Sequence, residues 1–328
     1  MVYPFIKALL NGDAAPSWGQ FAYRRGIKIV PSYILSIVLL IAIGYAQFSS
    51  PRDMAVSVIA HLLFVHTWFS ATYGSINGVL WTLAVEVEFY AVFPLIWFVF
   101  KRLPYVMALA LIAFSIGFRS YALACCLHTF APLMIDNLPG YLDTFACGML
   151  AAYLYVRYRE QLRGTAAKAA ATAVALGGFV WLASLLHGLW LMRAAPDWST
   201  VWQIGNRTLV AAAFVMMALG SLLAFSWWQR TVANPVLLFL AVISYNLYLY
   251  HQALARLLLK WHIPPFTGAS EHADAKWPVP YTFVAFAATI AWAAFIAFAC
   301  ERPLLRIKLE QWRGLLSRRG REGALPPA

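Results

Sequence analysis

The chain has 328 residues, of which 62% are hydrophobic and only 12% are charged, and its mean hydropathy is +0.69. Soluble domains carry roughly 25% charged residues, so this composition excludes an ordinary soluble fold. The formal charge of +12 does not indicate a nucleic-acid-binding protein, because the basic residues form short clusters between apolar runs, as in membrane proteins.

The apolar runs predict an all-α, polytopic integral membrane helix bundle of about eight spans. In chain order we expect them at about Ile29–Gln47, Val79–Phe100, Tyr105–Ala124, Gly140–Val156, Ala169–Leu191, Thr208–Phe225, Val236–Leu259 and Tyr281–Cys300. The basic residues of the loops then put both termini in the cytoplasm, provided that the stretch Met54–Phe69 does not cross. His61 and His66 interrupt that stretch, and we expect it to be re-entrant or interfacial. Three regions follow: an N-terminal cytoplasmic segment over 1–28, a membrane domain over 29–303 and a basic cytoplasmic tail over 304–328.

The first apolar run follows a basic cluster, Arg24, Arg25 and Lys28, in the stretch FAYRRGIKIVPSY. Three cations at a membrane surface could bind an anionic phosphate group, with arginine contributing paired hydrogen bonds and lysine a point charge. They could equally serve only to orient the chain in the membrane.

The second run contains two carboxylates, Glu86 and Glu88, in NGVLWTLAVEVEFYAVFPL. A bare charge inside a membrane costs at least ~2.5 kcal/mol, so something has to compensate for each of them. Residues four apart share one face of a helix, which puts Thr82, Glu86 and Tyr90 on one polar stripe. Glu86 and Glu88 point roughly 200° apart and cannot form a close carboxylate pair. Glu86 is either functional or paired structurally with an arginine such as Arg119 or Arg207.

A third polar stretch, ISYNLYLYHQ, places Ser244, Tyr248 and His251 on one face of a predicted helix. Histidine is the side chain best suited to move protons near neutral pH, although a buried structural histidine fits the pattern equally well. No metal site is expected, because His61 and His66 are five residues apart and no HExxH or CxxC pattern occurs.

Taken in order, these stretches resemble the acyltransferase-3 family of membrane O-acyltransferases. The family's basic pattern before a proline is similar to Arg24, Arg25, Lys28 and Pro31 of this chain. The family's W-S/T-L-x-x-E-x-x-F-Y signature matches Trp81, Thr82, Leu83, Glu86, Phe89 and Tyr90. Three further elements match Asp143, Phe145 and Gly148, then Ser244, Tyr245, Tyr248, Leu249 and His251, and finally Glu301, Arg302 and Pro303.

The resemblance implies a bacterial inner-membrane enzyme that moves an acyl group, expected to be acetyl, from acyl-CoA to a hydroxyl of a carbohydrate or lipid-linked glycan. Acyl-CoA is then a substrate, with no tightly bound cofactor, and membrane lipid is the surrounding partner. The catalytic residues are expected to be Glu86 and His251. The donor's phosphates would bind Arg24, Arg25 and Lys28, and substrate would contact Trp81, Tyr90, Asp143, Tyr245 and Tyr248.

Two departures from the family pattern stand out. Val87 occupies the place of the family's second glutamate, so Glu88 is not the usual partner of Glu86. The family's opening span, with an arginine and the histidine regarded as catalytic, has no counterpart here, which indicates a misplaced start codon or a shortened member.

The alternative function is a non-enzymatic transporter or flippase of glycans, in which the charges line a path. No inverted repeat supports it.

Overall fold

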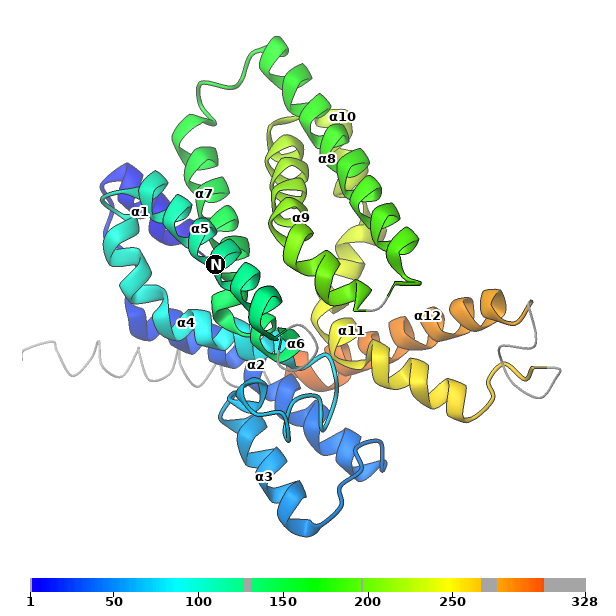
Figure 1. The fold of residues 1–328 in the computed structure, drawn as a ribbon. Coiled ribbons are helices and arrows are strands. Elements are labelled where there is room, and N and C mark those ends of the chain that lie inside the picture. Colours follow the sequence, from blue (N-terminus) through cyan, green and yellow to red (C-terminus); the bar gives the residue numbers. More distant parts are fainter. Residues whose placement is uncertain (1, 127–130, 196, 267–275, 304–328) are drawn as a thin grey trace, which may run out of the picture. The chain divides into compact units, whose positions relative to one another are not determined.

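The computed structural model describes residues 2–126, 131–195, 197–266 and 276–303, and the predicted tail over 304–328 lies outside them. Within these ranges the chain is helical, without strands (Figure 1). The elements are α1 (Tyr3–Asn11), α2 (Trp18–Ala42), α3 (Pro51–Leu62), the 3₁₀ turn η1 (His66–Trp68), α4 (Trp81–Phe100), α5 (Pro104–Cys126), α6 (Ala131–Ile135), α7 (Leu138–Tyr158), α8 (Thr165–Met192), α9 (Trp198–Leu223), α10 (Ser226–Val232), α11 (Pro235–Lys260), α12 (Pro278–Phe295) and the π-helical end η2 (Ile296–Glu301).

Seven of the described helices are long and apolar enough to cross a membrane: α2, α4, α5, α8, α9, α11 and α12 with η2. The predicted class, a polytopic membrane helix bundle, is therefore confirmed. The one remaining expected span, Gly140–Val156, corresponds to α7, a helix of 21 residues that carries Asp143 and Arg157 and is not among the seven. Because α7 packs against α5 and α9, a more polar sequence is accommodated by neighbouring helices.

The first long helix differs from its predicted span. It runs from Trp18 to Ala42 rather than from Ile29 to Gln47, so Arg24, Arg25 and Lys28 lie within the helix instead of before it. The backbone amide of Gln20 donates to the Ser17 hydroxyl at 3.2 Å, which caps the first turn. Arginine and lysine are good helix formers, so a hydropathy window ends before the helix does.

Helix α3 is too short to span a membrane. Ser50 accepts a hydrogen bond from the backbone amide of Asp53 at its start, and the helix ends 12 residues later at Leu62. At 1.5 Å per residue it measures about 18 Å, against a hydrocarbon core of about 30 Å. This agrees with the expectation that Met54–Phe69 is not a full span; its re-entrant or interfacial placement stays a prediction.

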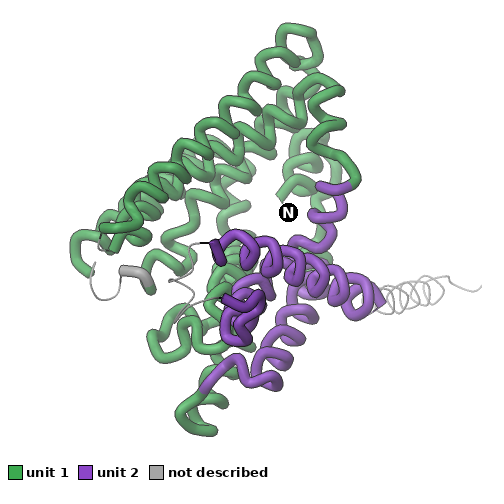
Figure 2. Tube along the Cα trace, turned by 90° about the vertical axis from the view of Figure 1, so that its right-hand side faces the viewer, with its two compact units in different colours: residues 1–22, 48–235 green, residues 23–47, 236–328 purple. Residues whose placement is uncertain are grey.

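The chain divides into two compact units, which are described separately (Figure 2). Unit 1 comprises residues 1–22 and 48–235, and unit 2 comprises residues 23–47 and 236–328.

In unit 1, α8 and α9 lie side by side. A Cβ atom on Gly178 would lie 2.9 Å from the Met217 side chain, and one on Gly220 would lie 2.6 Å from the backbone of Ala175. Small residues thus allow close helix contact, as is common in membranes.

In unit 2, α11 contacts both α2 and the last helix. Ile243 packs with Ala293 and Ala297 in a small buried cluster. The Asn246 side-chain amide donates to the Glu301 carboxylate at 2.6 Å, which provides a partner for a charge at the end of a membrane helix.

Candidate functional site

Glu86 lies on α4 as half of a hydrogen-bonded pair. The hydroxyl of Tyr90, one turn further along, donates to Oε1 of Glu86, so the two side chains share the face that the sequence predicts. Tyr90 also packs edge-on against Phe21, with ring centroids 5.6 Å apart. Glu86 is partly exposed, and its carboxylate is held in a fixed direction by these contacts.

Glu88 occupies a different environment, as predicted. The indole Nε1 of Trp68 donates to Oε1 at 2.6 Å, and the backbone amide of Leu138 donates to Oε2 at 3.2 Å. Leu138 is the first residue of α7, and the preceding Asn137 does not cap that helix with its side chain. Glu88 therefore caps α7 from another helix, where the N-terminal end favours negative charge.

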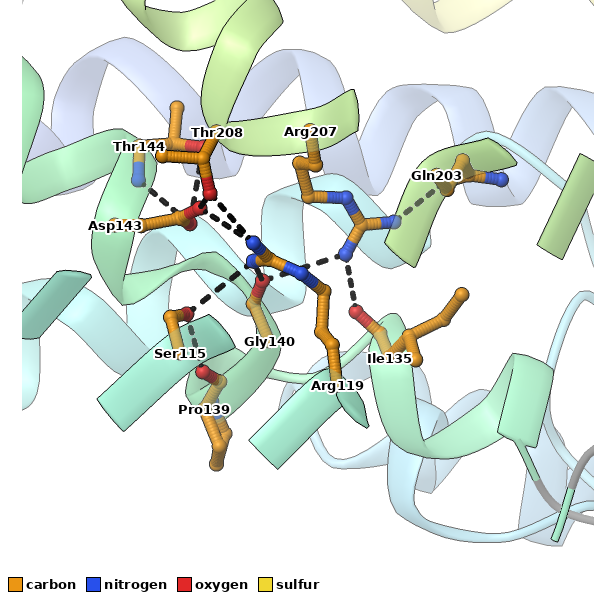
Figure 3. Close-up of polar contacts among 10 residues, drawn as sticks. All are labelled: Ser115, Arg119, Ile135, Pro139, Gly140, Asp143, Thr144, Gln203, Arg207 and Thr208. Carbon is orange, nitrogen blue, oxygen red and sulfur yellow. Dashed lines mark hydrogen bonds and ion pairs between the residues drawn. The ribbon is translucent and has the colours of Figure 1, made fainter. Parts of the chain in front are cut away.

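A polar assembly in unit 1 is centred on two arginines (Figure 3). Arg119, from α5, is 0% exposed and contacts Asp143 of α7 at 2.8 Å. The same guanidinium donates to the Gly140 carbonyl at 2.6 Å and to the Thr208 hydroxyl at 2.7 Å. Thr208 in turn donates to Asp143. A Cβ atom at position 140 would overlap the carbonyl oxygen of Ile135, so glycine is required where the two arginines converge.

The second arginine, Arg207 of α9, contacts Asp136 at 3.2 Å and donates to the Ile135 carbonyl at 2.5 Å. Its guanidinium also lies 3.8 Å from the centroid of the Tyr141 ring. The Tyr73 hydroxyl donates to the other oxygen of Asp136 at 2.6 Å. Burial raises the pKa of Asp136, while the hydrogen bond from Tyr73 and the charge of Arg207 act in the opposite direction. We call Arg119, Asp143, Arg207 and Asp136 the arginine–aspartate cluster.

This cluster corrects one sequence-based alternative. Arg119 and Arg207 were the proposed structural partners of Glu86, but both are bound to aspartates instead. It also places Asp143, an expected substrate-binding residue, in a fully buried ion pair. The role of Asp143 in binding stays a prediction, whereas its contribution to holding α5, α7 and α9 together follows directly from these contacts.

A cavity of about 500 Å³ opens beside Arg207, between α7, α8 and α9. Its lining is mainly apolar and aromatic with a few polar groups, which is the usual character of a small-molecule site. The lining residues are Tyr141, Thr144, Leu189, Trp198, Ser199, Trp202, Gln203, Arg207, Val210, Ala211 and Phe214. The Trp81 ring, an expected substrate contact, lies 5.3 Å from that of Tyr141. The sequence analysis did not predict this cavity. The pattern that could have indicated it is the pair Trp198 and Trp202, which are four residues apart and so share one helix face, with the polar residues Gln203 and Arg207 next along the helix.

In unit 2, His251 is exposed on α11 and its ring is oriented by the backbone. Nδ1 lies 2.8 Å from the Tyr248 carbonyl oxygen, which can only accept, so Nδ1 carries the proton and Nε2 can receive one. The rings of Tyr248 and His251 are 5.7 Å apart, as their spacing predicts. Tyr245 donates to the Ile29 carbonyl at 2.8 Å and so joins α11 to α2, the helix that carries Arg24, Arg25 and Lys28.

Two buried histidines form a stacked pair that the sequence did not predict. The rings of His61 and His66 are 3.9 Å apart and nearly parallel. Burial lowers the pKa of His61 to about 4 and that of His66 to about 3, so both are neutral at physiological pH. Among the described residues, no group of three or more His, Cys, Asp or Glu side chains gathers as metal ligands.

Comparison with known proteins identifies a family. A family model of the acyltransferase-3 type, described as "Acyltransferase domain", matches residues 8–298. Curated proteins of Staphylococcus aureus strains COL and N315, each named "Putative O-acetyltransferase", are 22% identical over 321 residues, covering 90% of this chain and 49% of each relative. The chain thus spans about half the length of the curated relatives it matches. No solved structure matches it.

Proposed function

Because the chain belongs to the acyltransferase-3 family, we propose that it transfers an acyl group, specifically acetyl, from acyl-CoA to a hydroxyl of a carbohydrate or lipid-linked glycan. The membrane would be the bacterial inner membrane, with both termini in the cytoplasm. In the reaction the acceptor oxygen attacks the thioester carbonyl, the carbon–sulfur bond breaks, and the acceptor's proton passes through a base to the departing thiolate.

The observation that carries this proposal is the carboxylate of Glu86, held by the Tyr90 hydroxyl within the family's signature stretch. A carboxylate hydrogen-bonded to a catalytic base fixes the orientation of that base and stabilises its protonated form. We assign this positioning role to Glu86, and the base that it would orient is the histidine that the family pattern implies. A half-buried carboxylate suits it better than Asp143, whose oxygens already bind Arg119, Thr208 and Thr144.

Other residues take supporting roles in the proposed reaction. Arg24, Arg25 and Lys28 bind the donor's phosphates, and the free Nε2 of His251 binds the acceptor hydroxyl or relays its proton. Trp81 and Tyr90 shape the space next to Glu86. The aromatic cavity beside Arg207 suits a sugar ring, because flat aromatic faces cover its apolar sides while Gln203 and Ser199 offer hydrogen bonds.

The test compares Glu86→Gln with Glu88→Gln, two changes on one helix. Membrane vesicles carrying the chain receive radiolabelled acetyl-CoA, and label incorporated into glycan is measured per amount of folded protein. We expect Glu86→Gln to lower transfer on the order of 10²-fold and to displace the pH–rate profile, since a base loses its orienting partner. Glu88→Gln is expected to retain the transfer rate and lose only stability. Partial recovery in Glu86→Asp would further support a positioning role.

Equal transfer by the Glu86→Gln variant and the unmodified chain would contradict the role of Glu86. Equal losses in both variants would mean that the changes act through helix α4 as a whole rather than through the Glu86 carboxylate.

A further inference from the structure

A second recess lies where the ends of α7, α8, α9 and α10 meet, with a volume of about 340 Å³. Unlike the aromatic cavity, it is lined largely by polar and charged side chains. The residues that form it are Tyr155, Arg159, Glu160, Leu162, Arg163, Lys168, Leu222, Leu223, Ala224, Ser226 and Gln229. We call it the basic recess. All of these residues belong to unit 1.

The basic recess carries more positive than negative charge. Its cations are Arg159, Arg163 and Lys168, and the only carboxylate in its lining is Glu160. Glu160 forms ion pairs with both arginines. Its Oε1 lies 3.4 Å from Nε of Arg159, and its Oε2 contacts Nη2 of Arg163. One carboxylate shared between two guanidinium groups leaves a net charge of +2 in the recess, three cations less one anion.

Arg159 is held in position before any ligand binds. Its Nη1 donates to the Tyr3 hydroxyl at 3.4 Å, and its guanidinium lies 5.9 Å from the centroid of the Tyr155 ring. Ser226 and Gln229 also line the recess and add hydrogen-bonding side chains to it. An arginine that is already ordered loses less conformational entropy when it binds an anion.

The backbone reinforces the charge of the side chains. Lys168 lies in the first turn of α8, a 28-residue helix that has no side-chain cap and no acidic residue in that turn. The unbonded amide groups at the start of α8 and the dipole of this helix favour an anion at this end. The positive-inside rule predicts that this loop faces the cytoplasm, where acyl-CoA and anionic lipid headgroups both occur.

From this arrangement we infer that the basic recess binds a phosphate group, through paired hydrogen bonds from Arg159 and Arg163 and the point charge of Lys168. The group is carried either by a soluble nucleotide such as coenzyme A or by a lipid headgroup. This inference goes beyond the proposed acyl transfer and does not depend on it, because binding alone is measured.

The experiment uses the full chain in phosphatidylcholine nanodiscs. Binding of coenzyme A, dephospho-coenzyme A and inorganic phosphate is measured by calorimetry, and bound phosphatidylglycerol is counted by native mass spectrometry in mixed nanodiscs. In the combined variant Arg159→Gln, Arg163→Gln, Lys168→Gln we expect at least about tenfold weaker binding of the probe that the recess takes, because charge-assisted hydrogen bonds are lost. Loss confined to coenzyme A identifies a nucleotide site, and loss confined to phosphatidylglycerol identifies a lipid site.

A matched control removes the same charge elsewhere, through Lys101→Gln, Arg102→Gln and Arg193→Gln. Lys101 and Arg102 lie over the Phe98 ring and Arg193 over the Trp190 ring, outside the recess. A complementary change, Glu160→Gln, is expected to tighten binding about threefold, because it removes the only competing anion in the lining. The inference is overturned if no probe loses affinity in the recess variant, or if the control loses as much.

Discussion

The arginine–aspartate cluster and the basic recess use the same kinds of side chain in opposite ways. In the cluster two arginines face two aspartates, and the side chains of Arg119 and Asp143 are 1% and 0% exposed. In the recess three cations face one carboxylate, and the side chain of Arg163 is 72% exposed. Both regions lie in unit 1 and both include α7.

The difference follows from the cost of removing a charge from water. An unpaired ion in the interior is strongly unfavourable, so buried charges occur in balanced pairs that also satisfy backbone carbonyls. At the surface, solvent screens an excess of charge, and an unbalanced group can remain available for a ligand. The balanced cluster therefore holds helices together, whereas the unbalanced recess is suited to binding.

Breaking the buried pair should have the largest effect. We expect Arg119→Met to destabilise the chain by about 3–5 kcal/mol, because Asp143 would remain buried without its cation. Thermal unfolding in detergent, followed by tryptophan fluorescence, measures the loss. The combined variant Arg119→Met, Asp143→Leu should recover much of it, since no buried charge is then left unpaired. A single variant as stable as the unmodified chain would remove the basis for calling this pair structural.

The ion pair between Arg207 and Asp136 should contribute less to stability than the pair between Arg119 and Asp143, and its contribution should depend on pH. Arg207→Gln is expected to cost about 2–3 kcal/mol at pH 7, less than Arg119→Met because Asp136 retains the hydrogen bond from Tyr73. Burial already raises the pKa of Asp136, and loss of the nearby cation raises it further. As the pH falls, Asp136 becomes protonated in both proteins and the ion pair contributes less, so the difference in stability should shrink.

Unfolding midpoints measured for both proteins between pH 5 and pH 8 test this expectation. A difference that stays constant or grows as the pH falls would mean that Arg207 acts through its contact with Tyr141 and not through the charge of Asp136.

The smallest effect on stability is expected in the basic recess. Arg163→Gln should change the free energy of unfolding by no more than about 0.5 kcal/mol, because exposed ion pairs contribute little. Unfolding midpoints at low and high salt measure this. A loss above about 2 kcal/mol would contradict the contrast between the two regions and give Arg163 a structural role.

Several features of the site could be predicted from local sequence alone. The shared face of Glu86 and Tyr90, and the separation of Glu86 from Glu88, follow from helical spacing and are both present. The partners of Arg119 and Arg207 were not predictable in this way. Arg119 binds Thr208, which lies 89 residues further along the chain, and no periodicity encodes such a contact.

The boundaries of the helices show the same limit. Hydropathy placed the start of the first span at Ile29, whereas the cap at Ser17 lets the helix begin at Trp18 and include the basic cluster. It also treated α7 as an ordinary span, although its polar residues depend on α5 and α9 for their partners. A hydropathy window averages composition and contains no information on capping or on neighbouring helices.

The helical membrane class, the family signature and the faces on which Glu86, Tyr90, Tyr248 and His251 lie can all be predicted from the amino-acid sequence, because they depend on composition and on spacing within one helix. Which carboxylate neutralises which arginine, where the aromatic cavity opens and where positive charge is left unbalanced become visible only in the folded chain. Each of these depends on side chains brought together from helices far apart in the chain. Charges that become buried there must be paired, whereas charges that stay exposed to solvent need not be.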